Sequence, residues 1–172
     1  DSYPTAIKVA FLLRNDQLIA ELERLAASFR AKGNQFLEIT KMGRTELQDA
    51  VPMTVGQEFH AFAASLESEI ALLRDSEKYL YEINMGATAI GSGINVPKGY
   101  VEAVAKELAT LTKKPIVPAK DMFAATWDQQ GFVVYSSALK SVAIKLSKIS
   151  GHLMLLTSGP RARLAGVNLP GP

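Results

Sequence analysis

The segment GRTELQDAVPMTVGQEF, residues 43–59, gathers hydrogen-bonding side chains just before a predicted helix. Five of six consecutive positions carry such a group: Arg44, Thr45, Glu46, Gln48 and Asp49. In one interpretation this is a helix-entry loop, in which Arg44 pairs with Asp49 and Thr45 satisfies backbone groups. In the other, Thr45 offers a hydroxyl to an anionic ligand, and the N-terminus of the next helix adds the positive end of its dipole. Spacing alone leaves both interpretations open.

Two further segments contain residue types that bind anions. MGATAIGSGIN, residues 85–95, holds three glycines, but a phosphate cradle needs a strand before it and a helix directly after it. We therefore expect a connection between helices in which backbones approach closely. TSGPRARL, residues 157–164, ends the longest predicted helix at Gly159. Its Arg161 and Arg163 are candidates for binding a carboxylate.

Histidine and cysteine offer little for metal chemistry. His60 and His152 are the only histidines, neither has a partner at metal-ligand spacing, and the chain has no cysteine. We expect no zinc site and no disulfide or thiolate chemistry. Trp127 and the methionines are predicted to fill the core or interfaces.

The composition is typical of a soluble globular protein. The 172 residues are 48% hydrophobic and 21% charged, with a formal net charge of +2. Because 19 basic residues are spread among 17 acidic ones, the charge does not favour nucleic acid binding. No apolar run approaches the ~20 residues of a membrane span, and no signal peptide pattern opens the chain. A cytoplasmic location is the expectation.

Apolar residues spaced by three and four predict the helices that must position these groups. Long helices are expected over residues 132–156, 55–82 and 16–39, with Asn15-Asp16 starting the last of these and Thr54 with Gln57 forming a capping box for the second. A shorter helix is expected over residues 98–112, and one more between residues 113 and 131.

No segment alternates strictly between apolar and polar residues, so the predicted fold class is an all-α bundle of long helices with very little β structure. We expect one central helical domain over residues 1–172. The chain starts at Asp1 and ends at Pro172 as if cut at both ends, and its long apolar faces call for further helices from missing chain or other subunits.

Three separated motifs resemble the aspartase/fumarase superfamily: KMGRTELQDAVPMTVGQEFHAF, NMGATAIGSGINVPKGY and LLTSGPRARLAGVNLP. They occur in the family's order and cover essentially the whole chain. DAVPMT, GATAIG and VPKGY are more similar to the aspartate ammonia-lyase branch than to the class II fumarases, which tend to read DATPLT and GGTAVG.

This resemblance implies an all-α homotetramer in which each active site is assembled from three subunits, with no organic cofactor. The expected reaction is the reversible deamination of L-aspartate to fumarate and ammonium, through a dianionic aci-carboxylate. The resemblance assigns Thr45 as a donor to a substrate carboxylate, with Glu46 beside it as a substrate-binding residue. It also implies a catalytic serine on a flexible loop beyond Pro172, so residues 1–172 alone are expected to be inactive.

Glu46 departs from the family pattern, which usually has His or Gln at this position. A carboxylate repels a dicarboxylate substrate, so Glu46 is expected to be protonated, turned away, or facing the amino group. Gly151-His152 also stands where the family often has Asn-Asp, and Arg163 and Gly166 where it commonly has glycine and glutamate. A fumarase-like hydro-lyase and a non-catalytic helical assembly module are the alternative functions.

Overall fold

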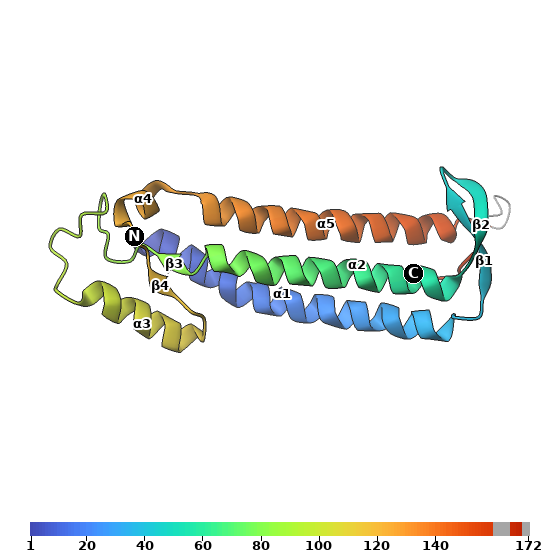
Figure 1. Cartoon of the computed structure of the whole chain (residues 1–172), viewed down its shortest axis with the longest axis horizontal. Coiled ribbons are helices and arrows are strands. Elements are labelled where there is room, and N and C mark those ends of the chain that lie inside the picture. Colours follow the sequence, from blue (N-terminus) through green and yellow to red (C-terminus); the bar gives the residue numbers. More distant parts are fainter. Residues whose placement is uncertain (160–165, 170–172) are drawn as a thin grey trace. The chain divides into compact units, whose positions relative to one another are not determined.

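The computed structural model describes residues 1–159 and 166–169, and within them most regular structure is helical (Figure 1). The helices are α1 (Ser2–Gln35), α2 (Val55–Ser76), the short 3₁₀ helix η1 (Glu77–Tyr79), α3 (Tyr100–Thr112), α4 (Met122–Trp127) and α5 (Gln130–Leu156). The strands β1 (Thr40–Thr45) and β2 (Gln48–Thr54) pair antiparallel, while β3 (Glu82–Ile83) and β4 (Val117–Pro118) pair in parallel. The predicted fold class, all-α with very little β structure, is confirmed.

The helix predicted over residues 16–39 is part of a longer one, α1, which begins at Ser2, passes through Asn15 without a break and ends at Gln35. The prediction that Asn15 starts a helix is therefore wrong. Pro4 lies in the first turn, where proline is tolerated, and no other proline or glycine occurs before Gly33. The Asn15 side chain is fully buried and finds its hydrogen-bond partners in other elements, so no helix end is needed to satisfy it.

Contacts between residues divide the chain into two compact units. The first combines Asp1–Ala20 with Ala71–Leu139, and the second combines Glu21–Ile70 with Lys140–Pro172. The first unit thus holds the beginnings of α1 and α5, the end of α2, and everything between them. Its core is formed by fully or nearly fully buried side chains: Leu12, Leu73, Leu80, Ile83 and Tyr135.

The glycine-containing segment 85–95 lies in the first unit as a connection of turns. The two-residue strand β3 precedes it, which the sequence did not predict, but α3 starts only at Tyr100, so the layout of a phosphate cradle is absent from this described segment. Gly91 has a φ of +108°, and a Cβ there would lie 2.5 Å from the Phe123 Cα. The expected close backbone approach is confirmed.

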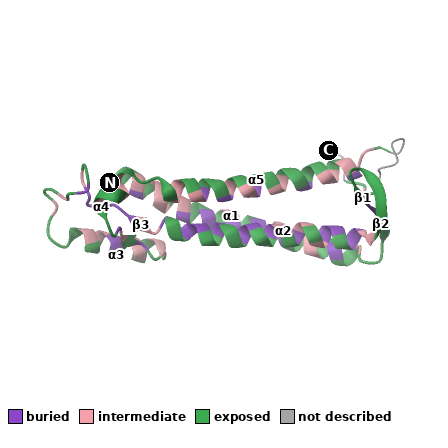
Figure 2. Cartoon of the chain, turned by 45° about the horizontal axis from the view of Figure 1, so that its top comes forward, coloured by how far each residue is buried: buried purple, intermediate pink, exposed green. Residues whose placement is uncertain are grey.

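The second unit holds the rest of α1, the β1–β2 hairpin, most of α2 and the end of α5. Its helices bury one face each, whereas most of the hairpin is exposed (Figure 2). Gly33 and Gly56 allow the end of α1 to approach the start of α2: a Cβ on Gly56 would lie 2.5 Å from the Gly33 carbonyl oxygen. This contact fixes the point from which the hairpin leaves and to which it returns.

Candidate functional site

The polar cluster identified in the sequence lies on the β1–β2 hairpin and not on an irregular loop. Arg44 pairs with Asp49 and Thr45 with Gln48, which leaves Glu46 and Leu47 as the two turn residues. Both have positive φ, 51° and 64°, as a type I′ turn requires. Asparagine and glycine normally occupy such positions, so Glu46 and Leu47 hold a strained backbone. Strain of this kind is common at functional sites.

A β-bulge at Gly43 changes the register of the hairpin just before the polar cluster. Met42 pairs with Pro52 but Arg44 with Asp49, so Gly43 opposes two residues of β2. A Cβ on Gly43 would lie 3.0 Å from the Val51 carbonyl oxygen, which explains why a glycine is there. The extra residue is on β2, which bends at the bulge, and the change of register places Arg44 opposite Asp49 and Thr45 opposite Gln48.

The base of the hairpin is anchored to the first turn of α2. Thr54 Oγ1 accepts from the Gln57 N–H at 3.0 Å, and the Gln57 side chain accepts from the Thr54 N–H at 2.9 Å. This reciprocal pair is the predicted capping box, which is confirmed. Val55 follows β2 directly and Ile39 precedes β1. The Val55 N–H donates to the Ile39 carbonyl at 2.9 Å, and this bond joins the two ends of the hairpin.

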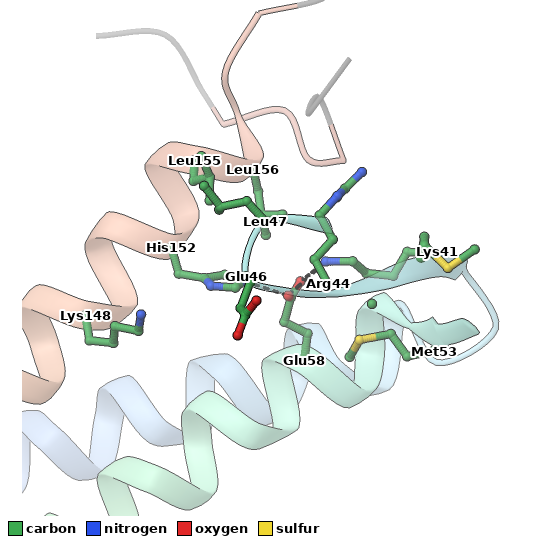
Figure 3. Close-up of a pocket in the computed structure, with 12 residues that line it drawn as sticks. Lys41, Arg44, Glu46, Leu47, Met53, Glu58, Lys148, His152, Leu155 and Leu156 are labelled. Carbon is green, nitrogen blue, oxygen red and sulfur yellow. Dashed lines mark hydrogen bonds and ion pairs between the residues drawn. The ribbon is translucent and has the colours of Figure 1, made fainter. Parts of the chain in front are cut away.

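A buried carboxylate joins three elements below the hairpin. Lys41 on β1 donates from Nζ to both oxygens of Glu58 on α2, at 2.8 and 2.7 Å. His152 on α5 places Nε2 2.7 Å from Glu58 Oε1 (Figure 3). The Glu58 side chain is only 9% exposed, so it requires these partners to remain charged.

A cavity of about 560 Å³ lies between the hairpin, the start of α2 and the end of α5. It is lined by charged residues (Lys41, Arg44, Glu46, Glu58, Lys148, His152) and by smaller or apolar ones (Met42, Gly43, Leu47, Met53, Leu155, Leu156). Glu46 extends from the turn into this space, on the side of Lys148 and His152 (Figure 3). The cavity can hold a small polar molecule, since both signs of charge line it.

The two predicted substrate-binding residues occupy different surroundings although they are adjacent in sequence. Glu46 lines the cavity, whereas Thr45 is exposed and does not. Among the described residues the Thr45 hydroxyl has no hydrogen-bond partner, so it does not satisfy backbone groups there as the entry-loop interpretation required. Their roles toward a substrate stay predictions.

The local ion pair of the entry-loop interpretation is present. Arg44 Nε lies 3.3 Å from Asp49 Oδ1, but the Asp49 side chain is 70% exposed, and such a pair adds little stability. Arg161 and Arg163, the other candidates for binding a carboxylate, lie outside the described residues. The hairpin is therefore the candidate site that the structure describes.

The two histidines differ in their surroundings. His60 on α2 has Nδ1 3.3 Å from Arg30 and its ring against Gly33, where it packs helices together. His152, by contrast, contacts the buried Glu58 at the cavity wall, a relationship that sequence spacing missed. The available indication was Gly151-His152 standing where the resembling family often has Asn-Asp.

Over residues 1–159 and 166–169, His, Asp and Glu side chains form no cluster of three or more that could hold a metal ion. In the same part of the chain, no helix has the length and apolar character needed to cross a bilayer.

The chain matches the protein family described as Lyase over residues 1–171. It is 50% identical to the aspartate ammonia-lyase of Pseudomonas aeruginosa over 171 residues, which are 99% of this chain and 36% of that protein. It is 49% identical to the aspartate ammonia-lyase of Corynebacterium glutamicum over 170 residues, 99% of this chain and 32% of that protein. The chain thus spans about a third of the length of these relatives.

Solved structures of two lyases also resemble this chain. The fumarate lyase:delta crystallin from Brucella melitensis bound to cobalt has a TM-score of 0.90 and 45% identity, over 94% of this chain and 35% of that one. The class II fumarase from Schistosoma mansoni has a TM-score of 0.89 and 28% identity, over 93% of this chain and 37% of that one. With its long helices and its polar hairpin, the chain belongs to the lyase family that includes the aspartases and fumarases.

Proposed function

We propose that this chain is the central helical domain, residues 1–172, of an ammonia-lyase that interconverts L-aspartate with fumarate and ammonium. The observation that carries the proposal is the 50% identity to proteins named aspartate ammonia-lyase over nearly the entire chain. The whole activity belongs to the longer protein, since the chain spans 36% of those relatives. The reaction is proposed to need no organic cofactor.

Thr45 is proposed to donate from its hydroxyl to a carboxylate of the substrate. Removal of a proton beside that carboxylate places a second negative charge on its oxygens. A fixed donor aimed at those oxygens then stabilises the intermediate more than the substrate. Within the described part of the chain the Thr45 hydroxyl has no hydrogen-bond partner, and its hairpin is fixed to α2 by the capping box; both observations support this role. The base is proposed to be a serine beyond Pro172.

Glu46 is proposed to bind the amino group of aspartate. A carboxylate attracts an ammonium group and repels a carboxylate, so Glu46 would favour an amino acid over a hydroxy acid. Its position in the lining of the cavity supports a contact with a bound molecule, whereas Lys148 in the same lining supports the competing expectation, that Glu46 pairs with a lysine and is turned away from the substrate. The variant Glu46→Gln distinguishes the two expectations. If Glu46 contacts the amino group, the variant should bind aspartate more weakly and bind fumarate as before.

A fumarase-like hydro-lyase is the second candidate, favoured by the structural likeness to the class II fumarase from Schistosoma mansoni. The deciding experiment supplies the full-length protein with L-aspartate and, separately, with L-malate, and follows the ultraviolet absorbance of fumarate. Fumarate from aspartate supports the ammonia-lyase, and fumarate from malate alone supports the hydro-lyase. If the protein turns over neither L-aspartate nor L-malate, the non-catalytic assembly module is the remaining candidate function. Residues 1–172 alone should give no fumarate.

We further propose a cytoplasmic homo-oligomer, most simply a tetramer with shared active sites. The apolar face predicted for α5 has buried residues at Tyr135, Val142, Ile149 and Leu156. Other apolar residues of α5 stay exposed, and these offer the surface for another subunit: Val133, Ile144 and Met154. Ile144→Asp should therefore lower the mass measured by sedimentation, while Lys140→Asp, at another exposed position of α5, should not.

A further inference from the structure

His152 is connected to the hairpin by a continuous chain of short hydrogen bonds. Its Nε2 lies 2.7 Å from Glu58 Oε1, and Glu58 in turn accepts from Lys41 Nζ at 2.8 and 2.7 Å. Lys41 belongs to β1, the strand that ends at Thr45. One carboxylate therefore contacts both β1, through Lys41, and α5, through His152.

The surroundings make this chain of contacts rigid. The side chains of Glu58 and Lys41 are only 9% and 12% exposed, so neither can exchange its partner for water without cost. The Phe62 ring meets the His152 ring edge-on, with centroids 5.6 Å apart, and restricts the plane of the imidazole. The imidazole itself is 35% exposed toward the cavity, so it can take up a proton from solvent.

We propose that His152 is a positioning residue: through Glu58 and Lys41 it sets the position of β1 and so of Thr45, in a manner that depends on its protonation. The proposal rests on the proposed function of Thr45. Neutral His152 donates one N–H to Glu58, and the imidazolium adds a full positive charge beside the same carboxylate. Strand β1 should be held more firmly on the acid side of the range in which histidines titrate, pH 5 to 8.

The charged groups around His152 determine whether the pH dependence of the hairpin can be attributed to His152 alone. Glu58 from α2 and Lys41 from β1 contact it directly or through one bond. The other charged groups that line the same cavity are Arg44 and Glu46 from the hairpin and Lys148 from α5. Among these residue types, histidine is the one whose charge ordinarily changes between pH 5 and 8.

The test uses two variants of the full-length protein. His152→Gln keeps a donor of similar reach but cannot be charged, whereas His152→Leu removes the donor. His152→Leu should lower kcat about tenfold, because it misplaces Thr45, whose hydroxyl acts mainly on the intermediate, and His152→Gln should recover most of this at pH 8.5. At pH 6 the kcat of the unchanged protein should exceed that of His152→Gln about threefold, and the ratio should fall to one by pH 8.5. His60→Gln is the matched control and should show a constant ratio.

Amide hydrogen exchange of residues 40–54 gives a second measurement that does not need activity. After correction for intrinsic rates, His152→Leu should lose protection there about tenfold, and His60→Gln should not. If the protein turns over neither substrate, this measurement still tests the proposal, so its failure is distinct from that of the proposed function. Unchanged hairpin protection together with a constant kcat ratio across pH would overturn it, even where His152→Leu lowers the melting temperature. If His152→Leu does not fold, the pH dependence of His152→Gln decides.

Discussion

Asn15 and Glu77, which are 62 residues apart in the chain, share a hydrogen bond of 2.8 Å in the core of the first unit. Asn15 Nδ2 donates to Glu77 Oε1 and also to the Leu73 carbonyl, while Tyr135 Oη donates to Asn15 Oδ1. The Lys114 ammonium donates to both oxygens of Glu77, at 3.1 and 3.0 Å. A single asparagine thus links α2, η1 and α5 from the middle of α1.

Replacing Asn15 with leucine should strongly destabilise the protein. The substitution leaves the buried Leu73 carbonyl and the Tyr135 hydroxyl without this partner and takes one donor from Glu77. The expected cost is about 3 kcal/mol, because buried polar groups lose their bonds without gaining water. Calorimetry should show a clear fall in melting temperature. Asn34→Leu, at an exposed position of the same helix, should change stability by less than about 0.5 kcal/mol; equal shifts for both variants would contradict the argument.

Stability should fall as the pH rises above about 10, the ordinary range of tyrosine and lysine titration. Burial raises the pKa of Tyr81, and the bond to Glu77 adds to this; burial and the Glu77 charge raise the pKa of Tyr135. Burial opposes the charge of Lys114, but hydrogen bonds to Asp16 and Glu77 outweigh it and raise its pKa. The unfolded chain therefore loses these protons first, so the stabilisation is complete below the ordinary pKa values and is lost as pH rises through the folded ones.

One group opposes this trend. Burial lowers the pKa of Lys8, and its cost to the folded state is relieved as the pH rises. Because three groups lose their stabilisation and only one is relieved of a cost, the free energy of unfolding should fall overall as the pH rises. Melting temperatures measured from pH 8 to 11 would reveal this fall. Lys114→Met should lower the melting temperature at pH 8 and flatten the decline above pH 10. A decline as steep as that of the unchanged protein would show that Lys114 does not contribute to it.

The long helices could be predicted because their apolar residues recur every three and four positions. The spacing from Phe132 to Leu156 matches α5, and the Thr54–Gln57 pattern marks the start of α2 correctly. The continuation of α1 through Asn15 could not be predicted. Asparagine before an acidic residue is typical of helix starts, and only burial against Leu73 and Glu77 reverses that preference.

The sequence singled out the polar segment that forms the hairpin, but not the shape of that segment. Thr45 and Glu46 lie on a hairpin whose strands are mostly exposed, so the apolar alternation that identifies strands is absent from the sequence. The contact between Glu58 and His152 joins residues 94 positions apart. Neither residue has a neighbour at a spacing that would indicate the other, so the contact required the three-dimensional structure.

The hairpin turn should become more stable when Leu47 is replaced by glycine than when it is replaced by alanine. Leu47 has a φ of 64°, which costs a residue with a Cβ about 1–2 kcal/mol and glycine nearly nothing. Both variants remove the side chain from the cavity, so their difference isolates the backbone term. The free energy of opening measured by amide hydrogen exchange in the hairpin should be about 1 kcal/mol higher for Leu47→Gly than for Leu47→Ala. The usual order, with alanine more stable, would mean that the turn is not strained at this position.

Thr45→Ala in the full-length protein should reduce kcat/KM. The reduction should correspond to a loss of about 2–4 kcal/mol of transition-state stabilisation, the scale of losing one donor to a developing oxyanion. Most of the loss should appear in kcat, because the hydroxyl acts mainly on the dianion and less on the bound substrate. Thr45 is exposed and the apolar faces of the helices are untouched, so the melting temperature should hardly change. Thr45→Ser keeps the hydroxyl and should recover most of the activity. Thr40→Ala, at another exposed position of β1, serves as the matched control and should behave like the unchanged protein. Near-normal kcat/KM for Thr45→Ala would mean that the hairpin is only the entry to α2, and that the substrate is bound by other parts of the protein.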